Sequence, residues 1–255
     1  MDSSSGAPGA LTVVGPGRAG SSIARAASAA GVEVTLIGRE IGLEEVSTRC
    51  VLLCVPDAEI EATARAVAAT GAAPATIGHV SGATTLDRLA AAGATEGRFS
   101  VHPLQTIPDR ETDLAGAHAA VAGNTDTALS VATGLAVTLG MHPFRVEETD
   151  RATYHAAASI GSNFLVTLEQ TAADLLDGIG VEQPREVLAP LLRRSLENWI
   201  EAGPEALTGP IARGDEVTVA RHREAIAERA PESLGTYDAL ADRTAALARP
   251  VEVPR

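Results

Sequence analysis

Lysine is absent from this chain of 255 residues, so all 20 of its basic residues are arginine. Without lysine there is no Schiff base with a carbonyl compound, no P-loop lysine and no lysine general acid. Proton transfer near neutral pH therefore falls to six histidines, to Tyr154 and Tyr237, to a carboxyl group with a perturbed pKa, to a thiol or to water.

Aromatic residues are also scarce, with three Phe, two Tyr and one Trp. Apolar residues still make up 45% of the chain, enough for a sizeable core. That core must be built from Ala, Val, Leu and Ile, and an alanine-rich core suits closely packed helices.

Positive charge is in short supply, because the formal net charge is -13. Nucleic acids and anionic membranes both need a basic footprint, so neither is expected as a partner. No run approaches the roughly 18 apolar residues of a membrane span, and the first residues lack the basic start and apolar core of a signal peptide. We expect a cytoplasmic protein with a flexible tail over residues 1–9.

The two cysteines, Cys50 and Cys54, lie in the run RCVLLCVPD. On a strand they would share one face about 13 Å apart, too far for a disulfide bond. They are interpreted as small apolar residues in a reducing compartment. The sequence predicts no metal site.

Short β-rich runs alternate with alanine-rich helical stretches through the first part of the chain. This alternation is typical of a parallel sheet with helices on both faces. The predicted strands are Ala10–Val14, Val32–Ile37, Cys50–Val55, Ala75–His79, Arg98–Val101, Ala117–Val121 and Pro143–Val146, and the predicted helices are Arg18–Ala30, Ala58–Thr70, Thr85–Ala92 and Asp126–Leu139.

The pattern becomes wholly helical after about Glu147. One long amphipathic helix is predicted from Thr149 to about Asp177, followed by helices at Pro184–Ile200, Val217–Arg229 and Glu232–Leu247. The expected architecture is thus α/β, with a Rossmann domain over residues 10–147 and an all-α domain over residues 148–255.

The sequence GPGRAG follows the first strand and opens the first helix, which is the context of a dinucleotide-binding loop. Its first glycine permits the tight turn, its second lets the backbone approach a pyrophosphate, and its third lets the helix pack against the strand. The helix N-terminus then offers amide groups to the phosphates. The loop consists of Gly15, Pro16, Gly17, Arg18, Ala19 and Gly20.

The second strand ends at Arg39, where an NAD site usually has an acidic residue for the ribose 2′-hydroxyl. An arginine suits a 2′-phosphate instead, and Arg18 could assist it. The predicted cofactor is therefore NADP, while the adjacent Glu40 keeps NAD possible.

Ligands of such folds bind at the carboxyl ends of the parallel strands. One strand ends in Val55 and Pro56, predicted to lie at the cofactor, and another is followed by Ser81, predicted to contact cofactor and substrate. A third carries His102, which could be catalytic or structural. Asp57 could simply cap a helix, and His79 could be a core imidazole.

The long helix carries a polar stripe formed by His155, Ser159, Ser162 and Asn163. At 100° per residue these side chains fall on one side of an ideal helix. The stripe is interpreted as facing a substrate, although interhelical hydrogen bonding would also account for it. In the turn-rich loop ALTGPIARGD, Arg213 could hold a carboxylate, or Asp215 could merely cap the next helix.

Taken together, GPGRAG, CVPD, HVSGA, HPLQT, YHAAASIGSNF and ALTGPIARGD resemble the Rossmann-like NAD(P)-binding proteins with a helical C-terminal domain of formerly unknown function. That family is related to ketopantoate reductase, pyrroline-5-carboxylate reductase and 6-phosphogluconate dehydrogenase. The resemblance spans about Leu11 to Leu247. It implies a C-terminal domain like that of 6-phosphogluconate dehydrogenase, often forming a homodimer, with the active site between the domains.

Several of these relatives have a catalytic lysine on the interdomain helix, followed one turn later by an asparagine. This chain has His155, then Ser159 and Asn163, in the matching region, so the proton donor is predicted to be His155, with His102 as the alternative. An ordinary histidine pKa of ~6.5 suits a donor near neutral pH.

The predicted reaction is reduction of a small α-keto acid of the ketopantoate type by NADPH. Ser159, Asn163 and Ser81 would orient the carbonyl and Arg213 would hold the carboxylate. The alternatives are an imine reductase of the pyrroline-5-carboxylate type, which needs no dedicated acid, and a non-catalytic dinucleotide-binding protein.

Overall fold

The computed structural model describes residues 6–38 and 42–248. Contacts within the chain divide it into two compact units, residues 1–162 and residues 163–255. The division falls inside the long helical stretch rather than in a loop.

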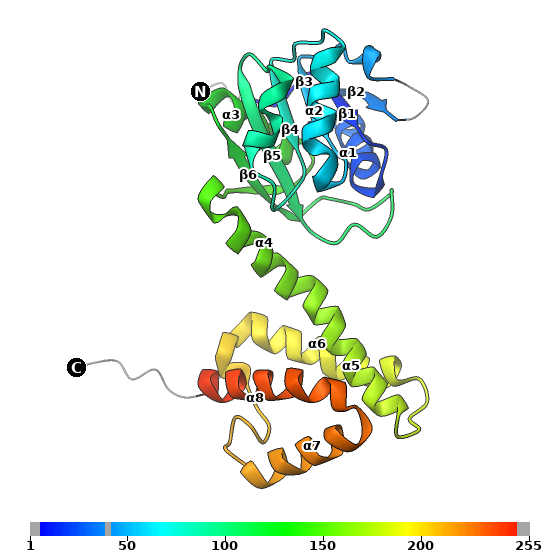
Figure 1. Ribbon diagram of the computed structural model, residues 1–255, viewed down its shortest axis with the longest axis vertical. Coiled ribbons are helices and arrows are strands. Elements are labelled where there is room, and N and C mark those ends of the chain that lie inside the picture. The colour runs from blue at the N-terminus through cyan, green and yellow to red at the C-terminus, as the bar shows by residue number, and fades with distance from the viewer. Residues whose placement is uncertain (1–5, 39–41, 249–255) are drawn as a thin grey trace, which may run out of the picture. The chain divides into compact units, whose positions relative to one another are not determined.

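The first unit is built on one sheet of seven strands in the order β2-β1-β3-β4-β5-β6-β7 (Figure 1). All seven strands expected from the sequence are confirmed, with small shifts at their ends. The strands are β1 (Ala10–Val14), β2 (Glu33–Ile37), β3 (Cys50–Leu53), β4 (Thr76–His79), β5 (Gly97–Leu104), β6 (His118–Gly123) and β7 (His142–Arg145).

The expected parallel sheet is confirmed except at one pair of strands, because β5 and β6 pair antiparallel, with Phe99 opposite Gly123. The reason lies in their connection. Residues 105–117 form no helix that could carry the chain back across the sheet, and parallel neighbours need such a crossover. All the other neighbouring strands are parallel.

Helices cover both faces of the sheet. Side chains that alternate along β1 point to opposite faces, so Leu11 and Val13 join one core cluster and Val14 joins the other. The first cluster packs under α1 (Arg18–Ala29) and α3 (Asp126–Thr138), and the second under α2 (Ile60–Ala69) and the segment η3 (Leu86–Ala92). The segment η3 is a 3₁₀ helix where the sequence predicts an α-helix.

The strand order changes direction at β1, because the chain passes from β1 to β2 and then returns to pair β3 on the other side of β1. Ligands of doubly wound sheets bind in the crevice at the carboxyl ends of the strands at such a switch point. Gly15 follows β1 directly and therefore lies at that place.

The stretch predicted as one long helix is helical throughout, but it contains a π-turn. It consists of α4 (Arg151–Ser159), the π segment η5 (Ile160–Phe164) and α5 (Leu165–Asp177). A π-turn closes its hydrogen bonds over a longer loop, so the 100° step assumed for the polar stripe does not hold from Ile160 to Phe164. The predicted angular positions of Ser162 and Asn163 therefore do not apply.

The second unit contains the remaining α-helices of the described chain. Besides α5 they are α6 (Pro184–Ala202), α7 (Glu216–Arg229) and α8 (Leu234–Ala248).

Both units also contain short 3₁₀ helices. In the first unit these are η1 (Leu43–Glu45), η2 (Asp57–Glu59) and η4 (Glu148–Asp150), and in the second η6 (Gly203–Ala206) and η7 (Pro231–Ser233). Over residues 6–38 and 42–248, none of the helices combines the length and apolar character that a membrane crossing requires.

The interior of the first unit leaves no room for a side chain at Gly78. A Cβ atom there would lie 2.4 Å from the Phe99 ring. We expect Gly78→Ala to lower the free energy of unfolding by about 1–3 kcal/mol, as overpacking does elsewhere. Urea unfolding should show that Gly78→Ala lowers the free energy of unfolding less in the Phe99→Leu background than in the wild type, because leucine leaves room for the added methyl group.

Gly235→Ala in α8 is the matched control, because a Cβ atom there meets nothing within 4 Å. It should leave stability unchanged or raise it by up to about 1 kcal/mol. If Gly78→Ala lowered the free energy of unfolding equally in the wild type and in the Phe99→Leu background, the steric explanation would be wrong.

Candidate functional site

The turn after β1 needs glycine at two positions. Gly15 has a φ of 107°, and a Cβ atom there would lie 2.4 Å from the carbonyl oxygen of Cys54. A Cβ atom at Gly20 would lie 2.0 Å from the carbonyl oxygen of Gly15. A side chain at either position would collide with backbone oxygens, so the two glycines are required for the tight turn itself.

The outer side of the same turn is open. A Cβ atom at Gly17 meets nothing within 4 Å, and α1 then begins at Arg18 with no acidic residue in its first turn and no side chain capping it. The first amide groups of this helix therefore lack side-chain partners within the described chain and can donate hydrogen bonds to an anion. Gly15 to Gly20 thus have the geometry that a dinucleotide diphosphate needs.

Apart from Ser81, which lies in the turn after β4, and Arg39, the other predicted cofactor residues lie in or next to this turn. Pro16 packs next to Gly38, Ala19 is half-buried and Arg18 is exposed. Val55 and Pro56 continue from β3, with a Val55 methyl group beside Gly15. Arg39 and Glu40, on which the choice between NADP and NAD depends, lie outside the described residues.

Ser81 organises the turn after β4. Its hydroxyl donates to Asp57 Oδ2 at 2.7 Å and accepts from the backbone amides of Thr84 at 2.9 Å and Ala83 at 3.2 Å. The single proton of this hydroxyl is therefore given to Asp57. The turn after β4 is joined in this way to the segment that follows β3.

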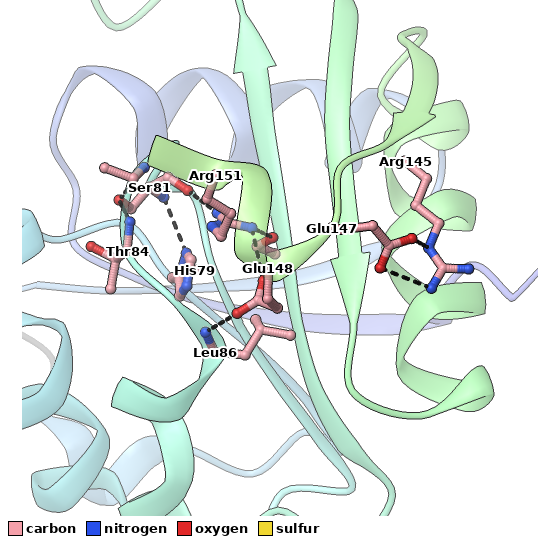
Figure 2. A network of polar contacts seen from close by, with 10 residues as sticks. His79, Ser81, Thr84, Leu86, Arg145, Glu147, Glu148 and Arg151 are labelled. Atoms are coloured by element: carbon pink, nitrogen blue, oxygen red, sulfur yellow. Dashed lines mark hydrogen bonds and ion pairs between the residues drawn. The ribbon is translucent and has the colours of Figure 1, made fainter. Parts of the chain in front are cut away.

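A buried arginine joins the beginning of α4 to the sheet (Figure 2). Arg151 donates to the Ser81 carbonyl oxygen at 2.5 Å and to the Ser100 hydroxyl at 2.7 Å, and it pairs with Glu148 at 3.3 Å. The other Glu148 oxygen accepts from the Leu86 amide at 2.7 Å. One ion pair thereby connects α4 with β4, β5 and η3.

Sequence reasoning missed Arg151 and Glu148. Both are charged residues at the start of a helix, where side chains are usually solvated. Only the acceptors at Ser81 and Ser100, far away in sequence, allow a guanidinium group to be buried there. No local pattern indicates that those acceptors are present.

His79 is fully buried under this network. Its Nδ1 atom accepts from the Ser81 amide at 3.2 Å, while its Nε2 atom has no hydrogen-bond partner within the described chain. Burial, and then the nearby Arg151 charge, lowers the pKa of His79 to about 3. The imidazole is therefore neutral near pH 7.

His102, Tyr154 and His155 form a cluster next to the Ser81 turn. The Tyr154 hydroxyl lies 2.6 Å from His102 Nδ1, and the centroids of the His102 and His155 rings are 6.0 Å apart. A Cβ atom at Gly82 would lie 2.6 Å from His155 Cδ2, so glycine lets the two imidazoles approach the turn. Two of the predicted catalytic residues, His102 and His155, are thus brought together.

The remaining predicted residues are not brought together by the described geometry. Ser159 is half-buried in α4 of the first unit, whereas Asn163 and Arg213 belong to the second unit and are exposed there. Asp215 does cap α7, accepting from the Thr218 amide at 3.0 Å, so the capping interpretation of that residue is confirmed. Within the described chain, no three His, Cys, Asp or Glu side chains are placed to hold a metal ion.

The sheet order, the glycine turn at its switch point and the helical region that follows define the chain as a Rossmann-type protein with an α-helical C-terminal part. Residues 117–244, half of the chain, match the family described as Domain of unknown function (DUF2520). The protein belongs to that family. No curated protein sequence matches it.

Solved structures share this fold at low sequence identity. Protein BF3122 from Bacteroides fragilis is 19% identical over 94% of this chain and 99% of its own, with a TM-score of 0.78. Protein TM1727 from Thermotoga maritima is 20% identical over 93% and 98%, with a TM-score of 0.74. Pyrroline carboxylate reductase from Plasmodium falciparum, solved with NADP bound, is 12% identical over 94% and 98%, with a TM-score of 0.64.

The buried imidazole of His79 makes the stability of the protein depend on pH. Below pH ~6.5 the unfolded chain protonates this histidine, whereas the folded protein keeps it neutral down to about pH 3. The unfolded state then binds more protons, so the free energy of unfolding falls as pH drops through this window, by up to about 1.4 kcal/mol per pH unit.

His79→Asn keeps an acceptor for the Ser81 amide but does not titrate. We expect urea unfolding between pH 7 and pH 4 to show a shallower decline for this variant than for the wild type. His142→Asn, at an exposed position of β7, serves as the control and should follow the wild-type curve. The same slope in all three proteins would rule out His79 as the cause.

Proposed function

We propose that this protein is an NADP-dependent reductase of a small α-keto acid of the ketopantoate type. The observation that carries the proposal is the cluster of His102, Tyr154 and His155 at the carboxyl ends of the strands. The glycine turn after β1 lies at the same edge of the sheet, since β1, β3, β4 and β5 are parallel. A proton donor, oxygen-binding groups and a dinucleotide loop on one edge are what carbonyl reduction needs.

The glycine turn supports a nicotinamide dinucleotide as the cofactor, because Gly17 and the start of α1 are open to a diphosphate. Among proteins of this fold, the Plasmodium falciparum enzyme was solved with NADP bound. In our proposal Arg39 and Arg18 hold the 2′-phosphate, and NAD remains the alternative cofactor.

When bound, a reduced nicotinamide would supply the hydride that the carbonyl carbon accepts. The π electrons of the carbonyl bond then pass to its oxygen, which takes up a proton. We assign that proton to His155, which regains it from water. From the sequence, our proposal assigns the orientation of the carbonyl to Ser159 and Asn163 and the binding of the carboxylate to Arg213. Ser81, whose proton goes to Asp57, contributes by shaping the turn next to the substrate.

An imine reductase is the second candidate, favoured by the shared fold with pyrroline-5-carboxylate reductases from Plasmodium falciparum and Streptococcus pyogenes. An iminium ion already carries its proton, so it accepts a hydride without a dedicated acid. The histidine and tyrosine cluster has no evident task in that reaction, and we therefore place the keto acid first.

In this proposal residues 10–147 bind the dinucleotide, and residues 148–255 contribute the substrate residues and the dimer interface. The free thiols of Cys50 and Cys54 suit a reducing compartment, so we propose that the enzyme acts in the cytoplasm.

The test of the reaction is NADPH consumption, followed by absorbance, with ketopantoate, other branched α-keto acids and pyrroline-5-carboxylate, and with NADH in parallel. Turnover of one keto acid is the expected result. Turnover of the imine alone would favour the second candidate. Binding of NADPH without turnover of any compound would point to a non-catalytic dinucleotide-binding protein.

His155→Ala should abolish most of the turnover while NADPH binding persists, because a positioned acid contributes about 10²- to 10⁴-fold. Steady-state kinetics and NADPH titration of the same preparation measure the two effects. His222→Ala is the matched control, since His222 pairs with Tyr237 in the second unit. Undiminished turnover in His155→Ala would remove this residue from the catalytic role.

We also propose a homodimer formed through the C-terminal helices. The helix α6 exposes a series of large apolar side chains, with Leu191 62%, Trp199 61% and Ile200 68% accessible. Apolar side chains gathered in this way are typical of an interface between copies of a chain.

A variant with both Trp199→Glu and Ile200→Glu should sediment as a monomer where the wild type sediments as a dimer. The desolvation of two carboxylates at the interface would oppose association. Val137→Glu, at an equally exposed position of α3, should leave the sedimentation coefficient unchanged. A monomeric wild-type protein, or a dimer in both variants, would contradict this interface.

A further inference from the structure

We propose that His102 hydrogen-bonds the substrate oxygen through its Nε2–H group as a neutral imidazole, and that Tyr154 is the positioning residue that fixes this tautomer. The inference rests on the proposed reductase function. It assigns separate tasks to the two imidazoles of the cluster, since His155 supplies the proton and His102 stabilises the negative charge that forms on the oxygen.

The contact between Tyr154 and His102 determines the tautomer. The Tyr154 hydroxyl lies 2.6 Å from His102 Nδ1, within the range of a strong hydrogen bond. Over the described chain the Tyr154 hydroxyl makes no other hydrogen bond, so Nδ1 is the protein atom to which we assign its proton. A neutral imidazole that accepts at Nδ1 carries its own proton on Nε2.

The Nε2 atom of His102 is left uncovered by Gly82. A Cβ atom at position 82 would lie 3.0 Å from Nε2 and cover it. The described residues offer Nε2 no hydrogen-bond partner, and the atom is not fully buried. Among the described residues this N–H group therefore has no protein acceptor, which leaves its proton for a substrate oxygen.

The surroundings of His102 favour the neutral ring. Burial, followed by the His155 ring and the Arg151 guanidinium group on α4, lowers the pKa of His102 to about 4, while Asp57 in η2 acts in the opposite direction. Burial also raises the pKa of Tyr154 to about 12, so the phenol keeps the proton that it donates.

A neutral donor suits the oxygen of a carbonyl undergoing reduction. Hydride transfer leaves negative charge on that oxygen, and a hydrogen bond aimed at it strengthens as the charge develops. Neutral imidazoles perform this task toward carbonyl oxygens in other enzymes. No proton leaves His102 in this step, and the proton that completes the alcohol comes from His155.

The tautomer is measured in the free protein by ¹⁵N NMR of the imidazole nitrogens. We expect a protonated Nε2 and an unprotonated Nδ1 for His102, assigned by the loss of these signals in His102→Gln. Tyr154→Phe removes the donor to Nδ1 and should shift both signals toward a mixture of tautomers. Tyr237→Phe, which alters the other histidine–tyrosine pair, should change only the signals of His222.

Kinetics provide the second readout. With any carbonyl compound that the enzyme reduces, Tyr154→Phe should lower kcat by about 10- to 100-fold with little change in KM, as loss of a supporting hydrogen bond does elsewhere. Thermal unfolding of the variant verifies that the fold is retained.

A protonated Nδ1 in the wild type, or an unchanged tautomer in Tyr154→Phe, would overturn this inference. If no carbonyl compound is reduced, the proposed function fails. The NMR result still shows whether Tyr154 controls the tautomer, so the two failures can be told apart.

Discussion

The buried guanidinium group of Arg151 is the interaction on which the arrangement of the site depends. It donates to a backbone carbonyl at the end of β4 and to a side chain of β5, and its partner Glu148 accepts from the first turn of η3. Removal of a charge from water is costly unless good acceptors replace the water. The acceptors at Ser81 and Ser100 therefore fix where α4 begins, and with it the positions of Tyr154 and His155.

The same guanidinium group influences the chemistry of the cluster. Burial is the main reason that the pKa values of His79 and His102 are lowered, and the Arg151 charge adds to it in both cases. The fold thus keeps two imidazoles neutral within a group of polar residues. Only His155, next to Gly82 in the partly exposed part of the cluster, is assigned to proton transfer.

Three glycines of the site, Gly15, Gly20 and Gly82, leave no room for a side chain, but the atoms that a side chain would meet differ. At the first two positions the neighbouring atoms are backbone oxygens, which cannot move aside, so these glycines define the turn at the switch point. At Gly82 the neighbours are imidazole rings, so this glycine determines how closely the rings approach the turn. The glycine turn and the histidine cluster thereby lie at one edge of a sheet whose strands run parallel there.

The sequence by itself determined the strands, the glycine turn and the change to helices, because these follow from local periodicity and from turns that only glycine can make. It also identified His102 and His155 as candidates from their positions after a strand and on a helix. Only the tertiary structure decided that β6 runs antiparallel to β5, that Arg151 is buried, and that Tyr154 donates to His102. Each of these depends on contacts between residues far apart in sequence, whose energies no local pattern records.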